Sequence, residues 1–197
     1  MNLLKKVSSI FGLGQGQIYY EHWFEEARPF VQPIHRVFSW DTATTANKKS
    51  AYSACVIGDV LPSGHIYIRH VYRGKLKFPF LLQKIGALLK EYNLKNTPMS
   101  LVIENKSSGT RLLKILEKTT IRDFVVSYSP KGSKIERAVL ASEVCRKKAV
   151  IFSRRKQAWK EDFFEELYSF PNCSYFDQVD AFNQLILFTK EFYSDLL

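Results

Sequence analysis

The sequence lacks any hydrophobic run long enough to cross a membrane. The apolar stretch at its N-terminus is short and is interrupted by Lys5 and Lys6, whereas a membrane-spanning helix needs about 20 mostly apolar residues. The same stretch has no convincing small-residue cleavage site of the kind that ends a secretory signal peptide. We therefore expect a protein that does not associate with a membrane.

Cysteine is scarce as well. The three cysteines, Cys55, Cys145 and Cys173, are widely spaced, so that none belongs to a CxxC pair. No combination of Cys and His has the spacing of a zinc finger. An odd number of cysteines without a secretion signal favours a reducing compartment, the cytoplasm. We expect each cysteine to be a small buried residue, not a metal ligand or a nucleophile.

Two kinds of catalytic motif are also missing. The phosphate loop of nucleotide-hydrolysing motors, GxxxxGK[ST], does not occur in the sequence. The run Gly12-x-Gly14-x-Gly16 follows no predicted strand and lacks the last glycine of a dinucleotide-binding loop. None of the four histidines is accompanied by a recognisable serine or cysteine nucleophile motif, which argues against a catalytic triad.

What the sequence has in excess is positive charge. Its 29 Lys and Arg residues outnumber 19 Asp and Glu residues, which gives a formal net charge of +10. A basic surface attracts polyanions such as nucleic acids, because binding releases their counterions. Charge alone leaves nucleic-acid binding and simple solubility equally open. With 197 residues, 46% of them hydrophobic, the chain is long and apolar enough for one globular domain.

The chain divides into an N-terminal appendage and one domain. We expect residues 1–33 to be an appendage or flexible linker, because closely spaced glycines break any long element there. Within this segment, residues 19–28 form a short helical candidate. Residues 34–197 form the predicted domain.

The predicted domain begins with strands and continues with alternating strands and helices. Leu61-Pro-Ser-Gly64 is a hairpin signal between two of the first strands, which we expect to form an antiparallel meander. Later strands are short and apolar, as in sheets that helices cover on both faces. The predicted fold is therefore α/β, a mixed sheet with antiparallel strands, then parallel strands, and flanking helices. The predicted strands are residues 36–40, 51–60, 65–72, 100–103, 124–128 and 149–152. The predicted helices are residues 78–92, 109–118, 133–148, 157–168 and 177–193.

Two of the predicted strands end directly in an acidic residue. Asp41 follows the strand at residues 36–40, and Glu104 follows the strand at residues 100–103. Neighbouring strands lie about 5 Å apart, so parallel pairing of these two would bring both carboxylates to one edge of the sheet. Two carboxylates that close together repel each other, and ionising both calls for a cation.

A second acidic pair lies at the start of the last predicted helix. Asp177 and Asp180 are three residues apart and share one face of that helix. Asp177 also stands at an N-cap position, so capping and metal binding are both open for it. Asp180 lies one turn inside the helix and borders its apolar stripe, where an acid needs a partner or a metal. We interpret Asp180 as functional, with a paired structural acid as the alternative.

The sequence thus predicts Asp41, Glu104 and Asp180 as catalytic carboxylates and, together with Asp177, as metal ligands. Hard oxygen ligands without convergent histidines suit Mg²⁺ or Mn²⁺ better than zinc. Two such ions can activate water and stabilise the leaving oxygen in phosphodiester cleavage. A basic surface around an acidic, metal-binding centre is what a DNA-cutting nuclease requires.

Five sequence marks, in this order and spacing, carry a resemblance to a known family. With them the chain, from about residue 38 to residue 188, resembles the nuclease domain of the large terminase subunit of tailed phages, which has a ribonuclease H-like fold. The resemblance implies an endonuclease that cuts concatemeric viral DNA during genome packaging. The marks are Ser39-Trp-Asp-Thr-Ala43, Val102-Ile-Glu-Asn-Lys-Ser-Ser-Gly109, Lys131-Gly-Ser-Lys134 with Arg137, Leu167-Tyr-Ser-Phe-Pro171 and Phe176-Asp-Gln-Val-Asp-Ala181.

The resemblance implies a role for each acidic residue of these marks. Asp41 would be shared by two metal ions, Glu104 would hold one of them, and Asp180 would hold the other. Asp177 matches a position where the family tends to place an acid or a histidine, so it would be a helper.

The basic residues of these marks suggest DNA contacts. Lys131, Lys134 and Arg137 match a basic segment suited to the DNA backbone, and a solvated helix start is the alternative. Lys106, two residues after Glu104, could reach a phosphate or could equally be a surface lysine.

The wider setting follows from the same resemblance. Double-stranded DNA is the expected partner, with a terminase small subunit, a portal or a separate ATPase motor as further candidates, in the cytoplasm of a bacterial host or phage-infected cell. A complete family member carries an ATPase motor ahead of the nuclease. Because the phosphate loop is missing, we expect an excised domain or the product of a shortened or split gene. A ribonuclease H-like junction resolvase or transposase relative and an inactive prophage-derived DNA-binding remnant are the alternatives.

Overall fold

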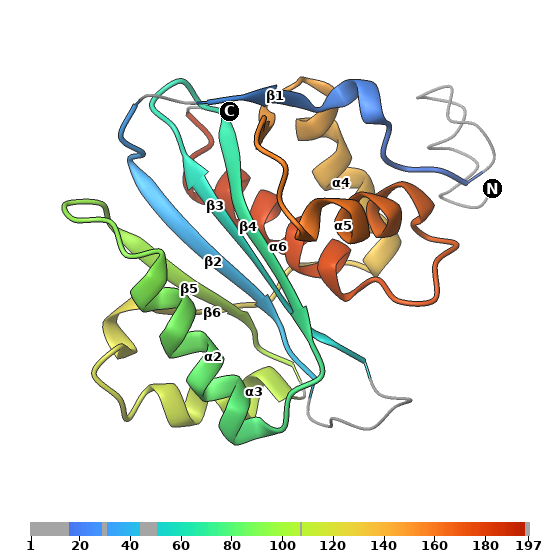
Figure 1. Cartoon of the computed structure of the whole chain (residues 1–197). Helices are drawn as coiled ribbons and strands as arrows, with labels where there is room; N and C mark the ends of the chain where they lie inside the picture. Colours follow the sequence, from blue (N-terminus) through green and yellow to red (C-terminus); the bar gives the residue numbers. More distant parts are fainter. Residues whose placement is uncertain (1–15, 29–30, 44–50, 107, 196–197) are drawn as a thin grey trace.

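The computed structural model describes residues 16–28, 31–43, 51–106 and 108–195. These residues form a seven-stranded mixed sheet with helices on both faces (Figure 1). The strand order is β1-β7-β4-β3-β2-β5-β6. The predicted α/β architecture is confirmed: antiparallel strands come first and parallel strands follow.

The strands and α-helices from residue 34 onward begin and end within two residues of the predicted positions, and the short 3-10 helix Arg122–Phe124 was not predicted. In the described ranges, no helix is long and apolar enough to cross a membrane. The strands are β1 (Glu25–Ala27), β2 (His35–Asp41), β3 (Ser53–Val60), β4 (Ile66–Gly74), β5 (Met99–Glu104), β6 (Val125–Tyr128) and β7 (Val150–Ser153). The helices are α2 (Phe78–Glu91), α3 (Ser108–Leu116), α4 (Lys134–Arg146), α5 (Trp159–Ser169) and α6 (Asp177–Phe192), with short 3-10 helices η1 (Glu21–Trp23) and η2 (Arg122–Phe124).

Strand β2 lies where the antiparallel and parallel parts of the sheet meet. It pairs antiparallel with β3 on one side and parallel with β5 on the other. Strand β3 is buried along its whole length, because helices cover both faces of the sheet at this point. Such strands carry nearly continuous apolar runs, which is why they are recognisable in the sequence.

Side chains of β2 alternate between two separate cores. Phe38 and Trp40 pack with α2 and α3 on one face of the sheet. Val37 belongs to the larger core beneath α4, α5 and α6 on the other face, and Ser39 reaches α6 on that face through a hydrogen bond. This alternation follows from the two-residue repeat of a strand.

The N-terminal segment corrects one prediction. Residues 19–28 were expected to be helical, but they form η1 and then β1, which pairs in parallel with β7 at the edge of the sheet. Tyr19 is completely buried, and its hydroxyl donates to Asn183 Oδ1 and to the carbonyl oxygen of Ala138. The described part of the predicted linker therefore packs as part of the domain. A domain boundary at residue 33 stays a prediction.

Candidate active site

Asp41 and Glu104 are the last residues of β2 and β5. The two strands run parallel with Trp40 opposite Ile103. The acids that follow these residues therefore lie at the same edge of the sheet, where the strands end, as predicted. The close approach of α3 to this edge requires Gly109. A Cβ atom at that position would lie 1.9 Å from the carbonyl oxygen of Glu104.

Helix α6 brings the second acidic pair to this edge. It packs across β2 and β3 (Figure 1), and its first turn carries Asp177 and Asp180. Both residues are only 6% exposed. The structure therefore gathers all four predicted metal ligands from three segments that lie far apart in the sequence.

The four carboxylates influence one another electrostatically. Burial is the main reason why the pKa of Asp41 lies well above its ordinary value, and the neighbouring Asp180 is the next. Asp177 and Glu104 raise the pKa of Asp41 further, whereas Lys134 lowers it. All three other acids of the group thus act on Asp41, and its role as the central metal ligand stays a prediction.

Asp180 has one oxygen with a partner and one without. Its Oδ2 accepts a hydrogen bond from the ammonium group of Lys134, which also lies 4.2 Å from the centre of the Phe176 ring. Its Oδ1 is buried and meets no hydrogen-bond donor among the described residues. Burial raises the pKa of Asp180, and Lys134 opposes that shift.

Asp177 does not cap helix α6. The N-cap is Phe176, whose side chain forms no capping hydrogen bond. Oδ2 of Asp177 instead accepts a hydrogen bond from the backbone N–H of Tyr52 at 3.2 Å. Burial raises the pKa of Asp177. The capping alternative is therefore wrong, while the metal-binding role of Asp177 stays a prediction.

Two residues predicted to bind DNA lie at the carboxylates. Helix α4 begins beside them, after a capping box at its N-terminus. Nη1 of Arg137 donates to Oε1 of Glu104 at 3.1 Å, and Lys134 pairs with Asp180. Arg137 is 6% exposed, and its contact with DNA stays a prediction. The Lys134 side chain is 45% exposed, and its contact with DNA stays a prediction.

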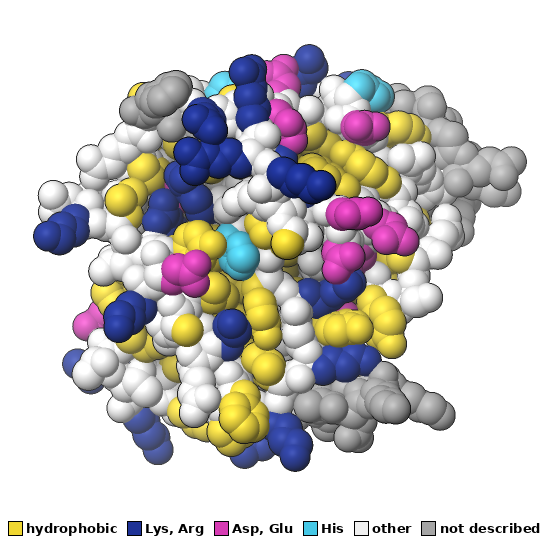
Figure 2. Space-filling view, viewed as in Figure 1, with side chains coloured by type: hydrophobic (Ala, Val, Ile, Leu, Met, Phe, Trp, Pro, Cys, Tyr) yellow, Lys and Arg dark blue, Asp and Glu magenta, His cyan; other side chains and the backbone are white. Residues whose placement is uncertain are grey.

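The other two predicted DNA-binding residues are exposed. Lys106 lies in the turn after β5, and Lys131 lies in the loop before α4. Lys and Arg side chains also spread over much of the face in Figure 2, with a dense group near the top of the view. The location of Lys106 and Lys131 is compatible with phosphate binding, which remains a prediction for both.

In the part of the chain that the structure describes, no group of three or more Asp, Glu, His and Cys side chains is arranged to hold a metal ion as it stands. The ion pairs give a physical reason. Lys134 holds an oxygen of Asp180, and Arg137 holds an oxygen of Glu104. Two of the four carboxylates are thus oriented toward cations that the chain itself supplies.

Sequence reasoning missed two buried polar residues near the acids, Glu166 of α5 and Gln184 of α6. Glu166 is 5% exposed and Gln184 is 3% exposed. Nothing in the local pattern distinguishes Glu166 from the neighbouring Glu165. The spacing of Gln184, four residues after Asp180, places both on one face of the helix, and this was the only available signal.

Comparison with known proteins identifies the family and the fold. The family model described as the terminase RNaseH-like domain matches residues 38–187 of the chain. No curated protein matches the chain.

Solved structures with the same fold come from thermophilic phages. The large terminase of a thermophilic bacteriophage, in complex with ADP, has a TM-score of 0.63 at 10% identity, and the match covers 86% of this chain and 43% of that one. The large terminase nuclease of thermophilic phage G20c with bound cobalt has a TM-score of 0.64 at 11% identity, with 89% and 98% covered. The present chain thus has a ribonuclease H-like fold and spans less than half of the ADP-bound large terminase.

Proposed function

Because the chain belongs to the terminase RNaseH-like domain family, we propose that it is a metal-dependent DNA endonuclease of the terminase large-subunit type. Its substrate is concatemeric, double-stranded viral DNA that is cut during genome packaging. A terminase small subunit, a portal or a separate ATPase motor is the proposed partner. The family match, the net charge of +10 and the convergence of four carboxylates support this proposal.

One observation carries the metal-dependent part of the proposal. Oδ1 of Asp180 is buried and unpartnered among the described residues, and two further acids, Asp177 and Glu104, act together with Asp180 on the neighbouring Asp41. A buried polar atom without a partner costs free energy. A divalent cation coordinated by this oxygen would remove that cost, so the residues present fit a metal.

The choice of metal rests on ligand chemistry. All four predicted ligands are carboxylates, which suit Mg²⁺ and Mn²⁺. The G20c nuclease has been solved with bound magnesium, with bound cobalt and with bound zinc, which supports the use of a divalent ion. We propose two Mg²⁺ or Mn²⁺ ions for this chain.

Each carboxylate has a distinct proposed role. Asp41 would be shared by the two cations, which agrees with the influence of the other three acids on its pKa. Glu104 would hold one cation, and Asp180 would hold the other with Asp177 beside it. Bound ions of this kind lower the pKa of the attacking water and stabilise the leaving oxygen.

The basic residues have two proposed roles. Arg137 and Lys134 neutralise Glu104 and Asp180 in the metal-free chain, because they pair with these acids in the structure. A cation held by Asp180 would compete with Lys134 for its carboxylate, and the Lys134 ammonium would then be available for a DNA phosphate. Lys106 and Lys131 hold phosphates on the exposed rim.

A plasmid-cleavage assay tests the proposed function. The wild-type chain should nick or cut supercoiled plasmid in Mn²⁺ and should stop when the metal is chelated. Asp41→Ala should lose cleavage, because the residue between the two ions is gone. The variant should still bind DNA without metal, which serves as a control for folding.

Equal cleavage by wild type and Asp41→Ala would overturn the assignment. Cleavage of branched DNA in preference to linear duplex would instead indicate a junction resolvase. DNA binding without any binding of Mn²⁺ would indicate an inactive remnant.

A further inference from the structure

Gln184 is the only α6 side chain for which hydrogen bonds to both β2 and β5 are seen within the described residues. Its amide group donates to Oγ of Ser39 at 2.9 Å. The same nitrogen lies 3.3 Å from the carbonyl oxygen of Trp40 and 3.3 Å from that of Val102. Gln184 therefore fixes the rotation of α6 relative to both strands.

These contacts lie directly beside the carboxylates. Trp40 is the residue before Asp41, and Val102 is two residues before Glu104. Gln184 itself follows Asp180 by one helical turn. A single buried amide thus connects the backbones of all three segments that carry the acids.

Glu166 holds the beginning of the same helix. Its Oε1 accepts hydrogen bonds from the backbone N–H groups of Gln178 at 2.7 Å and Val179 at 3.1 Å. Backbone N–H groups in the first turn of a helix have no partner within the helix, and Phe176 supplies no side-chain cap. Glu166 of α5 provides the missing acceptor between Asp177 and Asp180.

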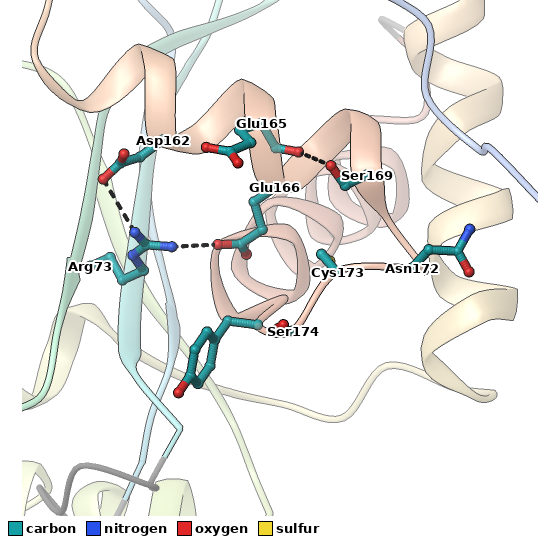
Figure 3. Close-up of a pocket in the computed structure, with 9 residues that line it drawn as sticks. Arg73, Asp162, Glu165, Glu166, Ser169, Asn172, Cys173 and Ser174 are labelled. Atoms are coloured by element: carbon teal, nitrogen blue, oxygen red, sulfur yellow. Dashed lines mark hydrogen bonds and ion pairs between the residues drawn. The ribbon is translucent and has the colours of Figure 1, made fainter.

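Further contacts hold Glu166 in position. Its Oε2 accepts hydrogen bonds from Nε2 of Gln178 at 2.7 Å and from Nη1 of Arg73 at 3.0 Å. Figure 3 shows Arg73 between Glu166 and Asp162, at the wall of a cavity of about 400 Å³. Helix α6 is therefore tied to α5 and, through Arg73, to strand β4.

We propose that Gln184 and Glu166 are positioning residues for the carboxylate group. Gln184 sets the distance of Asp180 from Asp41 and Glu104, and Glu166 sets the first turn of α6 that carries Asp177 and Asp180. Metal ligands have to be held within a few tenths of an ångström of their productive positions, and the residues that orient them affect metal affinity. This inference rests on the proposed metal-dependent function.

The chain offers a matched control for Gln184. Thr189 is completely buried on the same helix, and its hydroxyl donates at 2.9 Å to the carbonyl oxygen of Leu185 within that helix. Thr189→Val removes a buried hydrogen bond that lies within α6 and keeps a side chain of similar shape. Gln184→Met removes the amide and keeps an unbranched side chain of similar length.

Calorimetric titration with Mn²⁺ tests the proposal, together with thermal melting and DNA binding in the absence of metal. Gln184→Met should bind Mn²⁺ about 10- to 100-fold more weakly than the wild type. Thr189→Val should stay near the wild-type affinity at a comparable melting temperature. Both should bind DNA without metal like the wild type, so the cleavage defect of Gln184→Met should lie in kcat.

Glu166 is tested by graded substitution, which keeps the proposal falsifiable where Gln184→Met does not fold. Glu166→Gln retains an oxygen for the two backbone N–H groups, whereas Glu166→Met retains none. The expected order of Mn²⁺ affinity is wild type, Glu166→Gln, Glu166→Met. Glu143→Gln is the control, because Glu143 also pairs with an α6 residue, Lys190, at 3.3 Å, but far from the acids along the helix.

The two possible failures are distinguishable. If the wild type binds no Mn²⁺ and Asp41→Ala leaves cleavage unchanged, the proposed function is wrong. If the wild type binds Mn²⁺ but Gln184→Met and Thr189→Val bind it equally well, or if the Glu166 variants match Glu143→Gln, the positioning role is overturned.

Discussion

Helices α2 and α6 cover opposite faces of the same sheet, and they are held there by different interactions. Helix α2 buries only leucine and isoleucine. Helix α6 buries apolar residues and many polar ones. The buried polar residues of α6 are Asp177, Gln178, Asp180, Asn183, Gln184 and Thr189.

The difference between these helices shows how the fold separates stability from chemistry. Apolar contact is non-directional, so the apolar stripe of α2 sets the rotation of that helix only approximately. Hydrogen bonds depend on angle and distance, so α6 is fixed in rotation by Gln184 and Glu166. Two of the four carboxylates, Asp177 and Asp180, lie on the helix that is held by directional contacts.

The largest expected effect is on the cleavage rate, in the variant Asp180→Asn on the polar helix α6. It keeps the shape of the side chain but removes a charge that the proposed cations need, so cleavage should fall about 100- to 1000-fold. Thermal stability should not fall by a comparable amount, because the ionised carboxylate is disfavoured by its own burial. Initial rates of plasmid cleavage in Mn²⁺ and a thermal melt measure both quantities. Near-wild-type cleavage would contradict the role of Asp180.

The variant Leu81→Ala, on the apolar helix α2, should lose stability and keep its cleavage activity. Leu81 is 1% exposed, so its truncation should lower the free energy of unfolding by about 2–5 kcal/mol. Mn²⁺ affinity and cleavage per folded molecule should stay unchanged. Denaturant titration and calorimetry at low temperature give the two values. Gly86→Ala is the control on the same helix: its added Cβ meets nothing within 4 Å, and stability should rise by about 0.5–1 kcal/mol.

A pH experiment measures how much the ionised Asp41 carboxylate lowers the stability of the metal-free chain. Folding raises the pKa of Asp41. The ionised carboxylate therefore destabilises the fold at pH values above the raised pKa. This destabilisation disappears at pH values below the ordinary pKa of 3.8. Asp41→Asn should therefore melt above the wild type at pH 7–8, by about 2–4 °C for each kcal/mol removed. That advantage should shrink as the pH falls. An advantage that grows toward low pH would contradict the raised pKa.

The smallest expected effect is on the exposed rim, in the variant Lys131→Ala. Removing one phosphate contact should weaken DNA binding modestly and reduce the slope of log affinity against log salt concentration by about 1. Mn²⁺ affinity should be unchanged, because Lys131 is not paired with a carboxylate among the described ion pairs. Salt titrations of DNA binding provide the slope. An unchanged slope would remove Lys131 from the proposed DNA-binding surface.

Much of the fold could be predicted because its signals are local. The apolar runs of β2 and β5 and the helical spacing in α2 and α6 depend on neighbouring residues only. Strand β1 could not be predicted, since Glu25 and Glu26 look polar in isolation. The strand exists because Phe24, just before it, packs against Phe152, with the ring centres 5.4 Å apart, and because β7 offers a pairing edge. Both partners lie more than 120 residues away in sequence.

For the candidate site, the convergence of Asp41 and Glu104 could be predicted because strand ends share an edge. The pairing of Lys134 and Arg137 with acids could not, because charge does not reveal which way a helix turns its residues. Gln184 was missed for a related reason. Its partners include the backbone carbonyls of Trp40 and Val102, and every residue type supplies such carbonyls.

The N-terminal segment has a practical consequence for anyone who trims the chain. A protein shortened to residues 34–197 would lose β1 and uncover one edge of β7, and exposed strand edges promote aggregation. It would also lose the buried hydrogen bond that the Tyr19 hydroxyl donates to Oδ1 of Asn183. The segment that looks most dispensable in the sequence therefore covers the edge of β7 and places a short strand with two glutamates, β1, at the edge of the sheet instead.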